Sequence, residues 1–144
     1  FEKEVDAVEV TVNDLEKDGF GKTPLFKIFV AEIAEEIVGI ALFYPRYSTW
    51  KGPTIHLEDL IVTEQKRGLK IGSALYKKVI EYGYNKGVKR IEWVVLDWNT
   101  PAVEFYKKTG YEVTGTHEKH AMGQKSLIFT IKIGQEIVQM ALFW

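Results

Sequence analysis

The sequence predicts a mixed α/β fold, and three observations support this class. The 144 residues, 46% of them hydrophobic and 13% aromatic, suffice for a substantial core, so we expect a single domain over residues 1–144. Two strand-like runs joined by a short turn predict a hairpin in the first half. Strand-like and helix-like segments then alternate, an order that indicates a mixed sheet flanked by helices.

The first half of the chain predicts one helix and three strands. Residues 1–20 mix acids with spaced apolar side chains, and their cap and turn signals predict a short helix that ends near Gly19 or Gly21. An aromatic loop is expected at residues 47–53. The strand-like runs, rich in aromatic, aliphatic and β-branched residues, lie at 25–34, 37–44 and 54–62.

The second half changes period. Apolar residues recur at helical spacing over 71–82, and Gly87 stands where such a helix ends. The near-continuous apolar run 91–96 is typical of a strand covered on both faces. Thr100 as a cap and Pro101 in the first turn predict a helix that runs to Gly110. Two last strands are expected around 111–114 and 127–133.

Composition excludes several classes of function. A net charge of −1 and a pI near 6.4 give no basic field for nucleic acid or an anionic membrane, and no apolar run is long enough to span a bilayer. The absence of cysteine excludes disulfides and a cysteine acyl-enzyme. His117 and His120 lack metal-site spacing and a third ligand, so no metal is expected. Without a signal-peptide pattern at Phe1, we expect a cytoplasmic protein.

A basic, glycine-containing turn precedes the helix expected at 71–82. The turn reads Arg67-Gly68-Leu69-Lys70-Ile71-Gly72-Ser73, with Lys66 before it. A strand that enters a helix through glycines presents unpaired backbone N–H groups, which suits a pyrophosphate. An ordinary loop with solvated basic residues explains the same pattern, and both readings stay open.

The pair Glu58-Asp59 lies inside an otherwise apolar strand. Ideal alternation places the two carboxylates on opposite faces, so one of them is expected on a buried face, where its pKa rises toward that of a useful base. If both carboxylates serve one site, the strand contains a bulge that re-aims one of them. Structural ion pairs at a strand end are the alternative.

These motifs together resemble the GNAT superfamily of acyl-CoA N-acyltransferases, and within it the spermidine/spermine (diamine) acetyltransferases. The resemblance covers residues 10–111. The family's R-G-x-G-x-G turn corresponds to Arg67-Gly68-Leu69-Lys70-Ile71-Gly72, with Lys70 at the middle glycine, where we expect its ammonium to reinforce phosphate binding. The branch's L-E-D and W-N-x-P…F-Y-K correspond to Leu57-Glu58-Asp59 and Trp98-Asn99-Thr100-Pro101…Phe105-Tyr106-Lys107.

The resemblance implies a mostly antiparallel GNAT-like sheet whose opening strand–helix unit has no counterpart before Phe1. It implies acetyl-CoA as co-substrate and Glu58 as the base that deprotonates the amine. Tyr106 would protonate the leaving thiolate, although such a tyrosine is also a common core residue. The carrier would be bound by Leu60, Ile61, Val62, Arg67, Gly68, Leu69, Lys70, Ile71, Gly72, Ser73, Asn99, Tyr106 and Lys107.

The resemblance also implies a polyamine acceptor, with Trp50, Glu58 and Asp59 binding it, and direct transfer in a ternary complex. Another small amine, such as a thialysine-like amino acid or an aminoglycoside, is the alternative; a basic residue facing Asp59 would favour the amino acid. Outside enzymes, the alternative hypothesis is a non-catalytic acyl-CoA-binding domain. Relatives usually form homodimers, and we expect the same here.

Overall fold

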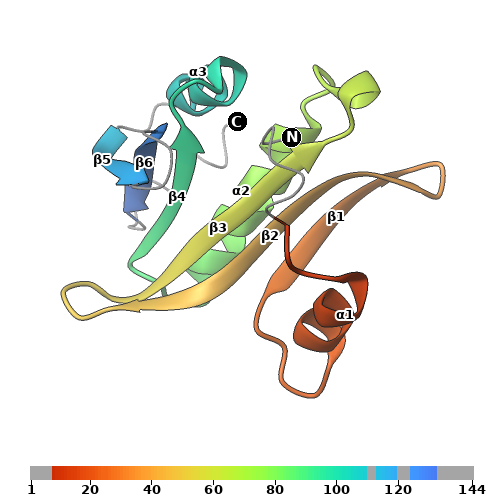
Figure 1. The fold of residues 1–144 in the computed structure, drawn as a ribbon, viewed down its shortest axis with the longest axis horizontal. Coiled ribbons are helices and arrows are strands. Elements are labelled where there is room, and N and C mark those ends of the chain that lie inside the picture. The colour runs from red at the N-terminus through yellow and green to blue at the C-terminus, as the bar shows by residue number, and fades with distance from the viewer. Residues whose placement is uncertain (1–7, 110–112, 120–123, 133–144) are drawn as a thin grey trace.

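The computed structural model describes residues 8–109, 113–119 and 124–132. Six strands form one sheet in the order β1-β2-β3-β4-β6-β5, and only the β3–β4 pair is parallel. The predicted mixed, mostly antiparallel sheet is therefore confirmed (Figure 1). The elements are α1 Val12–Phe20, β1 Lys27–Ile33, β2 Glu36–Ser48, β3 Gly52–Val62, a 3₁₀ turn Glu64–Lys66, α2 Ile71–Asn85, β4 Arg90–Leu96, α3 Thr100–Lys108, β5 Val113–Lys119 and β6 Gln124–Lys132.

The β2–β3 hairpin is longer than the sequence predicts. Its strands stay paired out to Ser48 and Gly52, so the expected loop at 47–53 shrinks to the three residues 49–51. Pro45 is tolerated within β2 because the β1–β2 pairing already ends at Phe43, which leaves that edge of β2 without a ladder. The hairpin therefore projects beyond the rest of the sheet (Figure 1).

Two helices begin at identifiable caps. Thr11 and Asp14 form a reciprocal capping box at the start of α1. The cap of α3 is Asn99, whose Oδ1 accepts a hydrogen bond from the N–H of Ala102 at 3.4 Å, so the prediction of Thr100 as the cap was wrong by one residue. Both amide and hydroxyl side chains serve as caps, and the sequence pattern alone does not separate adjacent candidates.

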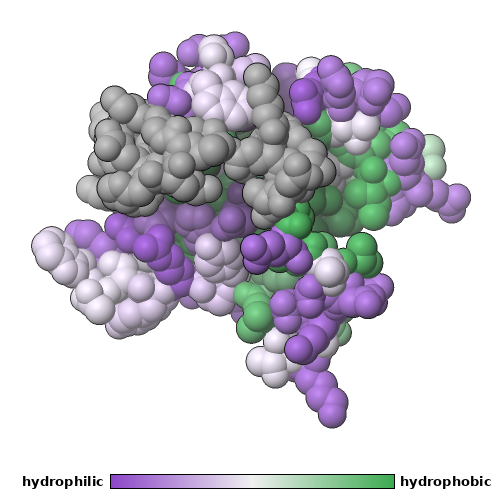
Figure 2. All heavy atoms as spheres, viewed as in Figure 1, coloured by the Kyte–Doolittle hydropathy of each residue, from purple (hydrophilic) through white to green (hydrophobic). Residues whose placement is uncertain are grey.

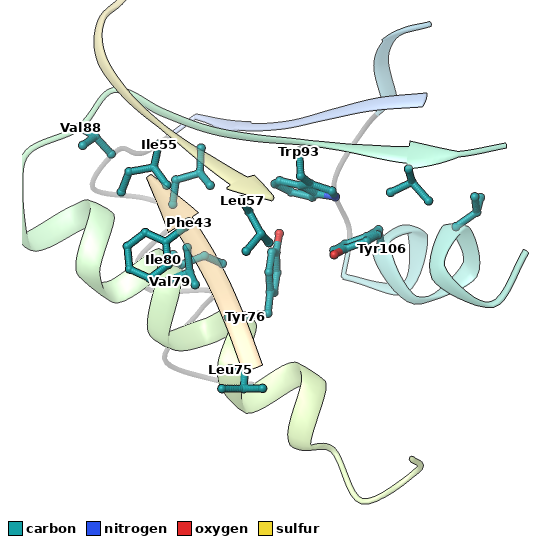
Figure 3. Close-up of a cluster of buried hydrophobic side chains, with 14 residues drawn as sticks. Phe43, Ile55, Leu57, Leu75, Tyr76, Val79, Ile80, Val88, Trp93 and Tyr106 are labelled. Atoms are coloured by element: carbon teal, nitrogen blue, oxygen red, sulfur yellow. The ribbon is translucent and has the colours of Figure 1, made fainter. Parts of the chain in front are cut away.

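Helix α2 covers one face of the sheet and forms the core with it. Its Leu75, Tyr76, Val79 and Ile80 are buried against strands β2, β3 and β4 (Figure 3). On the other face of β4, Glu92 is buried but Val94 is 45% exposed, so the prediction of a strand covered on both faces fails at Val94. Among the residues described, no helix has the length and apolar character to cross a membrane.

Candidate active site

The carboxylate pair lies at a β-bulge in β3. Phe43 pairs with Leu57 and Leu42 with Asp59, which leaves Glu58 as an extra residue without a partner on β2. Leu57 and Leu60 both pack into the core on the α2 side although they are three residues apart. The bulge therefore turns Glu58 and Asp59 together toward the opposite face, as the hypothesis of one shared site required.

Both carboxylates are exposed on that face, so the expected burial of one of them was wrong. The Glu58 side chain is 52% exposed, so it lacks the burial that ideal alternation predicted for one of the two acids. The bulge explains the difference, because it turns both acids away from the core that ideal alternation assigned to one of them. The contacts that hold Glu58 on this face come from its neighbours on β2 and β3.

Tyr44 and His56 are those neighbours. The Tyr44 hydroxyl donates a hydrogen bond to Glu58 Oε2 at 3.1 Å, and His56 Nε2 lies 3.5 Å from the same oxygen. Burial lowers the pKa of His56 against the opposing effect of the nearby Glu58 carboxylate, which keeps the imidazole neutral near pH 7. Burial and the Glu58 charge raise the pKa of Tyr44, so it remains a donor. Glu58 is thus held by one hydroxyl beside a neutral imidazole.

The bulge also lies where β3 and β4 separate. The parallel ladder between them ends at Leu57 and Trp93. Beyond it, a cavity of about 450 Å³ opens between β3, the start of α2 and helix α3. Its lining is Leu60, Ile61, Val62, Lys66, Arg67, Gly68, Lys70, Ile71, Gly72, Ser73, Asn99, Pro101, Ala102, Phe105 and Tyr106. The backbone of β3 in this stretch has no β4 strand beside it, so it is available to an extended ligand.

The glycine turn forms one end of the cavity. Gly68 and Lys70 both have positive φ, at +82° and +62°, so Lys70 takes the left-handed conformation that a glycine adopts most easily. The first hydrogen bond of α2 runs from the N–H of Ala74 to the carbonyl of Lys70. The amides that precede Ala74 in the first turn therefore have no acceptor within the helix and point out of its end. Arg67 braces the turn through its Nε, which donates to the Val62 carbonyl at 3.1 Å.

Tyr106 lies where the cavity meets the core. It is 7% exposed and packs on Trp93 and Tyr76, with ring centroids 5.0 and 5.8 Å away (Figure 3). Burial raises the pKa of its hydroxyl above the ordinary value, so the group is protonated at neutral pH. The side chain is therefore both a core residue and a lining residue of the cavity.

The structure does not bring every predicted residue together. Lys107 lies on the exposed side of α3, where its Nζ is 3.6 Å from Glu104, and neither it nor Leu69 lines the cavity. Trp50 is 91% exposed at the tip of the β2–β3 hairpin. Six residues of strand separate that tip from Glu58, which is roughly 20 Å. Binding of the acceptor by Trp50 stays a prediction.

Sequence reasoning missed part of the site. Ala102 and Phe105 line the cavity beside Tyr106. Ala102 lies three residues before Phe105 and four before Tyr106, so the helical spacing could have placed all three on one face. Tyr44 was missed because its contact with Glu58 depends on the cross-strand register, which the bulge changes. Within the described ranges, no cluster of three or more residues is suited to hold a metal ion.

The geometry defines a class of protein: a sheet opened between two parallel strands, with a basic, glycine-containing turn at one end of the opening and carboxylate and phenol side chains at the other. Comparison with known proteins names the class. The model of the acetyltransferase (GNAT) family matches residues 3–111, and the chain belongs to that family. It is thus an acetyl-CoA-dependent N-acetyltransferase of the GNAT type.

Relatives and solved structures agree with this placement. Thialysine N-epsilon-acetyltransferase of Bos taurus is 42% identical over 118 residues, which cover 76% of this chain and 69% of that protein. Spermidine/spermine N(1)-acetyltransferase-like protein 1 of Homo sapiens is 33% identical over 76% of this chain and 17% of its own length. The crystal structure of a GNAT acetyltransferase from Elizabethkingia anophelis with acetyl-CoA bound has a TM-score of 0.62, at 20% identity over 76% of this chain and 77% of that one. The predicted resemblance to the diamine acetyltransferase branch is confirmed.

Proposed function

We propose that this enzyme transfers the acetyl group of acetyl-CoA to the side-chain amine of a small thialysine-like amino acid. The bulge at Glu58 carries the proposal, because it aims Glu58 and Asp59 at one face beside the opening between β3 and β4. The 42% identity to a thialysine acetyltransferase supports this acceptor. A polyamine is the second candidate, supported by the 33% identity to a spermidine/spermine acetyltransferase-like protein.

The carrier is expected to lie in the cavity. The amide groups of its pantetheine arm would pair with the exposed backbone of Leu60–Val62 like an added strand. Its pyrophosphate would meet the amides of the first turn of α2, where the helix dipole is positive and Lys66, Arg67 and Lys70 add charge. Backbone groups and positive charge would thus bind the parts of coenzyme A that are the same whatever acyl group it carries.

Acid–base chemistry is assigned to the two residues on either side of the opening. The acceptor amine is mostly protonated near neutral pH, and Glu58 would take its proton directly or through a water. The deprotonated amine then attacks the thioester carbonyl, and a backbone N–H near Leu60 would stabilise the oxyanion. On collapse the C–S bond breaks, Tyr106 gives its proton to the thiolate, and the second proton of the attacking nitrogen passes through water to the tyrosinate, which leaves a neutral amide and a protonated Tyr106. Its raised pKa keeps it protonated until that step.

The test is acetyl-CoA-dependent release of free thiol with thialysine, lysine, ornithine, spermidine, putrescine and an aminoglycoside. We expect turnover on the amino acids, and a loss of about 10²- to 10⁴-fold in kcat for Glu58→Gln. Glu64→Gln, an exposed acid in the 3₁₀ turn, is the matched control and should keep wild-type rates.

Two outcomes would count against the proposal. Preferred turnover of a polyamine would replace the amino acid by the second candidate. Tight binding of acetyl-CoA with no turnover of any amine would remove the catalytic reading and favour a domain that only binds the carrier.

A further inference from the structure

An ion cluster of three side chains lies on the same face as Glu58. Glu92 on β4 is buried, with a side chain 9% exposed, and it pairs with both Arg46 and Arg90. Arg90 Nη2 lies 3.1 Å from Glu92 Oε2, which already compensates the buried carboxylate. Arg46 contacts the other oxygen through Nη1, and its side chain is 56% exposed. Two guanidinium groups on one carboxylate leave a surplus of positive charge at the surface.

Strand register brings this cation close to the proposed base. His56 is paired with Tyr44 on one side and with Glu92 on the other, so the Arg46 guanidinium, which reaches Glu92, lies next to His56. The same imidazole lies 3.5 Å from Glu58 on its other side. One histidine thus separates the Glu58 carboxylate from the Arg46 guanidinium. Their separation is on the order of 8 Å, the length of two to three residues of a strand.

Figure 2 shows the side of the molecule away from α2, where hydrophilic residues lie toward the β2–β3 hairpin and hydrophobic residues gather on the right half of the view. Arg46 and Glu58 belong to strands β2 and β3, whereas Val30 on β1, which pairs with Ile40, is an exposed apolar residue toward the other end. The charged part of this face is therefore polarised, with acids near the opening of the sheet and a cation farther along the hairpin.

We propose that Arg46, held in place by Glu92, binds the α-carboxylate of the acceptor and thereby selects an amino acid over a diamine. This inference rests on the proposed transfer to an amine at Glu58. A lysine-like molecule carries its reacting amine and its carboxylate at a separation similar to that between Glu58 and Arg46. A diamine of the same length carries a second cation instead, which Arg46 repels. An arginine fork also suits a carboxylate geometrically.

A purely structural role for the cluster gives a different expectation. If Arg46 only compensates Glu92, its removal destabilises the sheet and lowers affinity for every acceptor alike. If it binds the carboxylate, its removal changes the preference between two ligands that differ only in that group. Thialysine and the diamine formed by its decarboxylation are such a pair.

The experiment measures calorimetric binding of both ligands to the full chain saturated with CoA, so it does not depend on turnover. We expect the wild type to bind thialysine at least about tenfold more tightly than the diamine, the order expected for a partly exposed charge-assisted contact. Arg46→Gln should lose most of that preference, and Arg46→Lys should retain part of it. Lys89→Gln, which removes an exposed charge elsewhere, should leave the preference unchanged.

The preference ratio, together with thermal unfolding of each variant, decides the outcome. An Arg46→Gln protein that is folded and keeps the wild-type ratio overturns the inference while leaving the transferase proposal intact. Equal binding of the two ligands by the wild type, or binding of neither, overturns it as well. Absence of amine turnover in the thiol-release assay is a separate result and removes the proposed function itself.

Discussion

The two sides of the opening between β3 and β4 present different chemical groups. The cavity is lined by apolar side chains, by β3 backbone and by the first turn of α2, with the phenol of Tyr106 deep inside. The outer face carries the exposed side chains of Glu58, Asp59 and Arg46, with the mostly buried His56 between Glu58 and Arg46. One side offers general hydrogen-bonding groups, and the other offers a particular pattern of charges.

This difference suits a division of roles, with the carrier bound on one side and the acceptor selected on the other. In the proposed mechanism, backbone amides and a helix N-terminus bind a carrier that is the same for every acceptor. Charged side chains on a sheet face change their ligand with a single substitution. We therefore expect changes in the cavity to affect all acceptors equally, and changes on the outer face to discriminate among them. Each prediction below can break that division.

The largest effect is expected at Tyr106. Tyr106→Phe keeps the ring packed against Trp93 and removes only the hydroxyl, so kcat should fall by about 10²- to 10⁴-fold while the protein stays folded. The loss should be the same factor for every amine in the panel. Tyr84→Phe on the exposed side of α2 is the control. A loss that depends on the acceptor would contradict the division between the two sides.

Asp59 should give the next largest effect, and on the other side. Asp59→Asn removes a charge from the outer face, so KM for the acceptor should rise roughly tenfold, in the range of a charged hydrogen bond that is partly exposed. KM for acetyl-CoA should not change. Initial rates at varied amine and varied carrier separate the two constants, with Glu36→Gln as an exposed acidic control. Equal shifts in both constants would show that the sides are coupled.

Lys70 tests whether its side chain helps or hinders the carrier. Lys70→Gly removes a charge at the helix N-terminus, and KM for acetyl-CoA should rise by about threefold to tenfold. Stability should hold or rise, because relief of the left-handed backbone, about 1 kcal/mol, offsets the entropy of glycine in the unfolded chain.

Two further substitutions at this position separate charge from conformation. Lys70→Asn removes the charge but still tolerates a positive φ, so it should weaken the carrier as Lys70→Gly does. Lys70→Arg should retain wild-type affinity. Tighter carrier binding by the glycine variant would mean that the lysine obstructs the pyrophosphate.

What the sequence could predict follows from how local each feature is. The start of α2 after Gly68 and Lys70 depends on neighbouring residues, so the turn was predictable. The bulge at Glu58 depends on which residue of β2 stands opposite, and the exposure of both acids follows from that register. From ideal alternation, the sequence could predict only that a shared site requires a bulge in this strand. The bulge itself follows from the pairing of β2 with β3.

The same limit applies to the outer face. Arg46 and Glu92 are 46 residues apart, and His56 meets both of their strands only because β3 lies between β2 and β4. No local pattern links three strands in this order. The residues expected to choose the acceptor are thus the ones that depend most on tertiary structure.

The smallest effect is a pH dependence at His56, which sharpens the description of the outer face. Tyr44 and Arg46 face this imidazole from β2, Glu58 from β3 and Glu92 from β4. Burial is the largest influence and lowers its pKa below 6.5, so the unfolded chain binds this proton more readily than the folded one. Stability from this group is present above pH 6.5 and is lost as the pH falls toward the lowered pKa.

His56→Gln should therefore flatten the fall in unfolding free energy below pH 6.5, measured by urea denaturation at several pH values, while Tyr44→Phe should leave a titrating imidazole in place. An unchanged slope in His56→Gln would mean that the imidazole does not change its protonation on unfolding. Because the neutral ring separates Glu58 from Arg46, its protonation would add a third cation to this face, beside Arg46 and Arg90. Affinity for a diamine should then fall more steeply with acid than affinity for an amino acid.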